Sequence, residues 1–194
     1  MQDPRRYEAA LGSGGASGYL HEAGPAAPGT GTEVVIAVGP AFGAQIQRTL
    51  ADLDHRDVIA AMLEGIAEEG VPARVVRVYH TSDCAFIGHA GAQLSGSGVA
   101  IGLQSKGTAV IHQRDLPPLE NLELFSMSPN MTLDTYRDVG RNAARYAAQR
   151  PTSPVPVKID NTARLRLIVQ TTLMHLRETR QVRPDKLPTE LHLI

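Results

Sequence analysis

The side chains with the clearest chemical potential lie in residues 94–113, LSGSGVAIGLQSKGTAVIHQ. The run Ser-Lys-Gly-Thr at 105–108 predicts a turn between two apolar strands, at 99–103 and 108–112. Glycines free backbone N–H groups, which would converge with two hydroxyls and the Lys106 ammonium where a phosphate could bind. The alternative interpretation is a solvated hairpin turn whose polar residues only satisfy backbone geometry.

Residue order excludes two phosphate-binding motifs. A P-loop needs Gly-Lys, then Ser or Thr, then a helix, whereas here Lys106 precedes Gly107 and a strand follows. Gly96, Gly98 and Gly102 are spaced one residue too widely for a dinucleotide-binding loop, and no helix is expected there. The turn therefore favours neither a nucleoside triphosphatase nor a Rossmann dehydrogenase.

The sequence also lacks the usual patterns of a self-sufficient active site. Its seven histidines show no metal-ligand spacing such as H-E-x-x-H. Cys84 lies in an apolar stretch without an adjacent base, which favours a structural thiol over a nucleophile. No G-x-S-x-G nucleophile motif is present. These patterns favour binding or assembly over independent catalysis.

Composition limits the class of protein. The 194 residues, 42% of them hydrophobic, fit one domain plus a tail. Nineteen Lys and Arg against twenty Asp and Glu give a net charge of −1, so no basic field is expected to attract nucleic acid or an anionic membrane. No apolar run approaches a membrane span, and the first ten residues contain no apolar signal core. With a single cysteine, the chain is expected to be cytoplasmic.

Strands alternate with helices along the chain, which predicts an α/β domain with helices on both faces of one sheet. Residues 1–32, rich in Gly, Ala and Pro, are expected to form a flexible arm, and residues 33–194 the domain. The remaining expectations are helices that begin at Asp54 and Thr132, a short helical or irregular segment that begins at Asp83, and strands over 33–38, 73–79, 99–103 and 108–112. Because the turn at Lys106 is too short for a crossover helix, one strand should run antiparallel.

The C-terminal part of the sequence predicts a connector followed by a helix. Prolines at 151, 154 and 156 favour an extended chain, and residues 116–129 a loop or edge strand. A helix is predicted over 162–179, with one apolar stripe made of Leu165, Ile168, Val169, Thr172, Leu173 and Leu176.

Four segments resemble, in order and in spacing, the medium subunit of adenosylcobalamin-dependent diol and glycerol dehydratases. They are EVVIAVGPAF at 33–42, the segment 94–113, LPPLENLELF at 116–125 and TLDTYRDVGRNAARYA at 132–147. The resemblance runs from about residue 33 to about residue 179. It implies a three-layer α/β/α sandwich around a mixed sheet of roughly five strands.

The resemblance also implies a half-site for adenosylcobalamin, shared with the large subunit. The positions that match the family's cofactor-binding residues are Asp83, Ser105, Lys106, Thr108, Leu119, Asn121, Ser126, Arg164 and Thr171. The turn residues would meet the nucleotide loop or side-chain amides, and Asp83 would accept from corrin amides or a cofactor hydroxyl. Leu119, Asn121 and Ser126 would line the pocket of the lower base.

Arg164 and Thr171, on one predicted helix, would reach the phosphate and ribose. Leu165 and Arg166 stand where the family usually has Pro-Lys, and Thr171 where it commonly has Ser. The alternatives are a surface cation for Arg164 and a helix N-cap for Asp83. The D-x-H-x-x-G signature of proteins that displace the lower base of cobalamin is absent, so the cofactor is expected to be bound base-on.

The implied activity is the radical dehydration of a 1,2-diol to an aldehyde, with the substrate-handling residues on the large subunit. Implied partners are the large and small dehydratase subunits, assembled as a dimer of heterotrimers, and the reactivating chaperone. The alternatives are the small subunit of that chaperone and a non-catalytic small-ligand binding module. The sequence does not separate propane-1,2-diol from glycerol. Only residues 5–11 could form a short encapsulation helix, so a bacterial microcompartment is the minor alternative to the cytoplasm.

Overall fold

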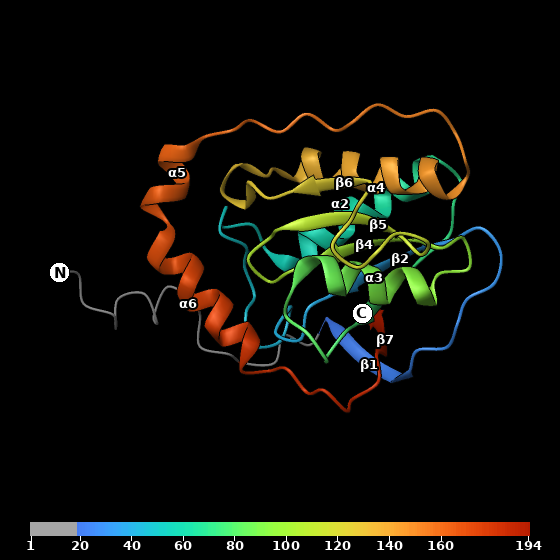
Figure 1. Ribbon diagram of the computed structural model, residues 1–194, viewed down its shortest axis with the longest axis horizontal. Helices are drawn as coiled ribbons and strands as arrows, with labels where there is room; N and C mark the ends of the chain where they lie inside the picture. Colours follow the sequence, from blue (N-terminus) through green and yellow to red (C-terminus); the bar gives the residue numbers. More distant parts are fainter. Residues whose placement is uncertain (1–18) are drawn as a thin grey trace.

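The computed structural model describes residues 19–194, which form an α/β domain with helices on both faces of one sheet (Figure 1). The strands are β1 (Leu20–Pro25), β2 (Val34–Val38), β3 (Ala73–Arg77), β4 (Val99–Leu103), β5 (Ala109–Gln113), β6 (Glu123–Phe125) and β7 (Thr189–Leu193). The helices are α2 (His55–Glu68), α3 (Cys84–Leu94), α4 (Leu133–Ala147), α5 (Asn161–Arg166) and α6 (Ile168–Thr179), with a 3-10 turn η1 (Ser128–Asn130). The predicted fold class is confirmed.

The sheet has a parallel centre and antiparallel flanks. Its order is β1-β7-β3-β2-β4-β5-β6; β2 pairs in parallel with β3 and β4, and the other pairings are antiparallel. In Figure 1, α2 and α4 cover one face and α3 covers the other. All five residues of β2 are buried, since Val34, Ile36 and Val38 pack toward α2 and α4 while Val35 and Ala37 pack toward α3. A strand buried on both faces requires the continuous apolar run that predicted it.

Side-chain caps fix the starts of three helices. Asp54 accepts from the Arg56 amide at 2.9 Å, and Asp83 accepts from the Ala85 amide at 2.9 Å. Thr132 forms a reciprocal capping box at the start of α4. Such caps satisfy amides that have no partner inside the helix. The three predicted helix starts are confirmed.

Helices α2 and α4 pack closely where each has a glycine. A Cβ on Gly65 would lie 1.9 Å from the Arg137 carbonyl oxygen, and a Cβ on Gly140 would lie 2.2 Å from the Met62 carbonyl oxygen. Backbone therefore packs on backbone at this crossing. Within residues 19–194, no helix is long and apolar enough to span a membrane.

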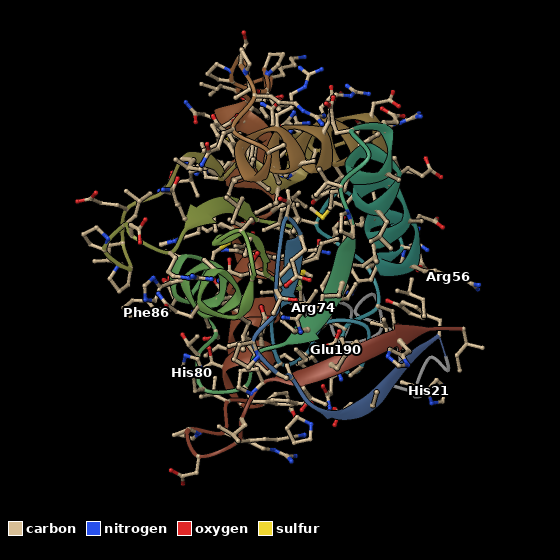
Figure 2. All side chains as sticks on the ribbon, turned by 90° about the vertical axis from the view of Figure 1, so that its right-hand side faces the viewer. His21, Arg56, Arg74, His80, Phe86 and Glu190 are labelled. Carbon is tan, nitrogen blue, oxygen red and sulfur yellow. The ribbon has the colours of Figure 1, made fainter. Side chains whose placement is uncertain are left out.

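The sheet edges differ from the sequence prediction, since the sheet has seven strands where roughly five were expected. Residues 20–25, inside the predicted arm, form β1, which pairs with the C-terminal strand β7; residues 1–18 lie outside the described part. Both strands are held mainly by backbone pairing, which leaves little trace in composition. Arg74 of β3 also bonds Glu190 of β7 at 2.8 Å, and Figure 2 shows the two side by side.

The predicted C-terminal helix is two helices, because the chain leaves helical geometry at Leu167, whose φ is −101° and ψ 9°. The predicted apolar stripe is largely exposed, with Leu165 69% and Ile168 58% accessible. Met174 and Glu178 are the buried residues of α6. The stripe stays largely outside the core because α6 lies beyond the end of the sheet, as Figure 1 shows, where the apolar contacts of Met174 are with a small cluster.

Candidate functional site

The turn that carries Lys106 lies at the carboxyl end of β4, beside the carboxyl ends of β2 and β3. The Gln104 amide donates to the Thr108 carbonyl at 3.0 Å, and the Gly107 amide donates to the Gln104 carbonyl at 2.9 Å. Gly107 has φ +97°, which strongly favours glycine. The two flanking strands are antiparallel, as predicted. In α/β sheets this edge is where ligands commonly bind.

Lys106 itself is half-buried and held by its backbone, since its carbonyl accepts from the Leu50 amide at 3.0 Å. Within residues 19–194, its ammonium has no carboxylate within salt-bridge distance. An ammonium without an ion-pair partner, on a fixed turn, can bind an anion without first breaking an existing contact.

Ser105 points into the protein and is fully buried. Its amide and hydroxyl donate to the Glu178 carboxylate, at 3.1 and 2.7 Å to Oε1, and its carbonyl lies 2.8 Å from His55 Nε2. All three polar groups are therefore used inside the chain. This geometry makes Ser105 an anchor of the turn; the predicted cofactor contact through its hydroxyl would require the bond to Glu178 to open.

His55 is the second anchor. Its ring stacks on Phe42 with centroids 3.8 Å apart, and its Nδ1 accepts from the Gly43 amide at 3.0 Å. Nε2 therefore carries the hydrogen and donates a hydrogen bond to the Ser105 carbonyl. Burial lowers the pKa of His55 to about 4. The imidazole is therefore neutral near pH 7 and acts as a fixed hydrogen-bonding bracket.

Tyr136 of α4 holds the turn from a third side. Its hydroxyl donates to the Gly107 carbonyl at 2.6 Å, and a Cβ on Gly107 would lie 2.6 Å from that hydroxyl oxygen. The side chain is fully buried. The turn is thus fixed by α2, α4 and α6 together.

Asp83 and Thr108 lie near the same edge. Asp83 is the N-cap of α3, which was the structural alternative for this residue. Its side chain is exposed and remains accessible to a ligand. Thr108 is buried, and its carbonyl lies 3.4 Å from Cys84 Sγ. Burial raises the pKa of the Cys84 thiol, as a structural cysteine requires.

The residues predicted for the lower-base pocket are divided between two ends of the sheet. Ser126 follows β6 at the Lys106 end, because Phe125 pairs with Ala109. Leu119, 71% exposed, and half-buried Asn121 precede β6 at the opposite end. Five extended residues span ~16 Å, so the described fold does not bring these positions together.

Ser126 lines a groove of about 420 Å³ between β6 and the proline-containing connector. Its other walls include Leu124, Val155 and Ile159, and both Leu124 and Ile159 are exposed. Glu123 also lines the groove, and its carboxylate accepts from Asn142 and from the Val155 amide. A groove with mainly apolar walls and a few polar groups suits a planar aromatic group.

Arg164 and Thr171 lie on the two C-terminal helices, not on one helix as predicted. Arg164 is exposed on α5, and Thr171 is half-buried on α6, on the same face as Met174 and Glu178. Seven residues of helix separate Thr171 from Glu178, a rise of ~10 Å. Thr171 therefore lies about 10 Å along α6 from Glu178, which bonds the turn, whereas Arg164 lies farther away on α5.

The sequence prediction missed His55, Tyr136 and Glu178, which all hold the turn by hydrogen bonds to Ser105 or Gly107. A signal existed for Glu178: it continues the i, i+4, i+7, i+11 row Leu167, Thr171, Met174, Glu178, which is the inward face of α6. The more hydrophobic row, the predicted stripe that includes Leu165 and Ile168, lies on a different and largely exposed face. Among the described residues, no cluster of three or more His, Cys, Asp or Glu could hold a metal ion.

The structure is an α/β domain whose Lys106 turn lies at the carboxyl edge of its parallel strands. The model of the dehydratase medium subunit family matches residues 39–153, more than half of the chain, and the protein belongs to this family. Among solved structures, it is similar to a glycerol dehydratase reactivase, with 23% identity and a TM-score of 0.50, over 64% of this chain and 97% of that one. A diol dehydratase-reactivating factor complexed with ADP and Mg2+ matches with 22% identity and a TM-score of 0.45, over 64% and 99%. At these identities the likeness is one of fold.

Proposed function

We propose that this chain is the medium subunit of a coenzyme B12-dependent diol or glycerol dehydratase and forms the nucleotide-side wall of the adenosylcobalamin site against the large subunit. The observation that carries the proposal is the Lys106 ammonium, which lacks an ion-pair partner among residues 19–194 and stands on a turn anchored by three helices. The membership in the dehydratase medium subunit family supports it.

The residues at the edge fit one side of such a cofactor. Lys106 would bind an anionic or strongly polar group of the nucleotide loop, Asp83 would accept from amides, and Ser126 would border the lower base in its groove. The base-on mode follows from the missing lower-ligand histidine motif. When bound, adenosylcobalamin supplies the radical that begins dehydration; this chain binds and orients it.

Leu119, Asn121, Arg164 and Thr171 have weaker support as cofactor contacts. The first two lie at the far end of β6, and Arg164 is distant from Lys106 along the C-terminal helices. They would reach the same ligand only if it extends over both ends of the groove or if assembly moves these segments. Thr171, on the inward face of α6, is the best supported of the four.

The partners would be a large and a small dehydratase subunit. The alternative, the small subunit of a reactivating chaperone, would require a different, ATP-hydrolysing partner. Copurification of the tagged full chain from cells that coexpress both candidate sets separates the two. Assays of the assembled complex with propane-1,2-diol and with glycerol then identify the substrate.

The decisive test is Lys106→Ala in the assembled complex. A hydrogen bond to a charged group contributes roughly 1.5 to 3 kcal/mol, so the affinity for adenosylcobalamin should fall about tenfold to a hundredfold. Turnover at saturating cofactor should change much less, because a contact at the nucleotide end binds ground and transition states alike. Lys158→Ala, which removes an exposed lysine of the connector, is the control. Equal affinity in Lys106→Ala and wild type would refute the proposal.

A further inference from the structure

Glu178 is a buried carboxylate that connects α6 to the Lys106 turn. It is 1% exposed, and Ser105 gives it both an amide and a hydroxyl hydrogen bond. A Cβ on Gly39, which follows β2, would lie 2.1 Å from Glu178 Oε1. The carboxylate therefore sits at the meeting point of β2, the turn and α6, in space that only glycine leaves open.

The rest of α6 has few buried contacts, although Thr179 bonds Ser82 at 2.9 Å and Arg177 donates to the Gln45 carbonyl at 3.4 Å. Met174 is its other fully buried side chain, and it belongs to a small cluster with Ala41, Ile46 and Leu50. The outer apolar residues of the helix are exposed. The two Ser105 bonds to Glu178 are thus a major part of what holds this helix at the edge.

We infer that Glu178 is a positioning residue: its carboxylate holds the Ser105 end of the turn and the last turn of α6 together, and so aims Lys106 at its ligand. The inference rests on the proposed function, in which Lys106 contacts the cofactor. Since Ser105 immediately precedes Lys106, loss of the anchor would let the lysine backbone move even though Glu178 touches no ligand.

The charges around Glu178 make this anchor sensitive to pH. Burial raises the pKa of Glu178 to about 7, opposed by the Ser105 bonds and the nearby Lys106 ammonium. The other ionisable groups facing this region are Cys84, whose thiol is neutral, and His55, which is neutral above pH 4. The ionised carboxylate is the stronger acceptor for the Ser105 amide and hydroxyl, so the positioned turn goes with ionised Glu178. Cofactor affinity should therefore rise as pH rises through about 7.

Amide hydrogen exchange on the full chain tests the anchor without any ligand. Glu178→Gln keeps the side-chain shape but replaces one acceptor oxygen with a donor NH2 group. The Ser105 amide should exchange about tenfold to a hundredfold faster in this variant. Glu64→Gln, which removes an exposed carboxylate from α2, is the matched control. Equal exchange of residues 104–108 in the two variants would overturn the inference.

A second measurement uses the assembled complex, with adenosylcobalamin affinity followed from pH 6 to 8. Wild type should gain affinity with rising pH, and Glu178→Gln should flatten the profile; an unchanged slope in the variant contradicts the inference. Ser105→Ala, which removes one donor and keeps the carboxylate, should retain the slope. If Lys106→Ala leaves affinity unchanged while the Ser105 amide still responds to Glu178→Gln, the proposed function fails and the anchor stands.

Discussion

Tyr136→Phe removes one oxygen atom and tests how much the turn depends on α4. The hydroxyl donates to the Gly107 carbonyl at 2.6 Å from a fully buried side chain. The change leaves that carbonyl without its donor in a dry environment, where an unmade hydrogen bond costs about 1 to 3 kcal/mol. For a chain of this size the melting temperature should fall by roughly 2 to 12 °C.

Tyr19→Phe is a matched control. Tyr19 is also buried, but its hydroxyl has no hydrogen-bond partner within residues 19–194. Removing it should leave stability unchanged or raise it, since a buried polar atom without a partner is unfavourable. Denaturant unfolding of the three proteins, followed by circular dichroism, gives the comparison. Equal losses in both variants would show that tyrosine packing, and not the bond to Gly107, determines the effect.

The remaining predictions concern protonation and packing. The pKa of His55 lies below its ordinary 6.5, at about 4, so its contribution to stability is present above pH 6.5 and is lost as pH falls toward 4, by roughly 3 kcal/mol in total. His55→Gln should therefore show a weaker fall in unfolding free energy between pH 7 and pH 4.5 than wild type; parallel curves would contradict the neutral buried imidazole. Gly140→Ala should destabilise by about 1 to 3 kcal/mol through its clash with the Met62 carbonyl, against a helix-propensity gain of ~1 kcal/mol. Thermal unfolding beside Glu64→Ala measures this, and a rise in melting temperature would refute it.

Local signals were sufficient for most of the fold. Asp54, Asp83 and Thr132 mark helix starts because their side chains satisfy amides a few residues away, and the apolar run of β2 reports burial on both faces. The short spacing across Lys106 required a hairpin. Each of these depends on neighbours in sequence, so the sequence alone could reveal them.

The features that could not be predicted depend on contacts distant in sequence. β1 and β7 pair across almost the whole chain through their backbones, which composition does not encode. The bond between Ser105 and Glu178, 73 residues apart, helps to hold α6 at the edge. An apolar row on a helix does not show whether that row packs on its own domain or stays exposed.

Several apolar side chains are exposed at the edge proposed to bind the cofactor. The exposed Leu165, Ile168 and Leu176 lie on the helices beyond Lys106, and exposed Leu124 and Ile159 lie at the groove beside Ser126. Several exposed apolar side chains beside a proposed ligand site favour an interface with a partner. A large subunit docked there would bury these rows and remove water from around Lys106, which strengthens its attraction for an anionic group. The exposed apolar residues of the C-terminal helices therefore support the proposal that a partner subunit completes the site.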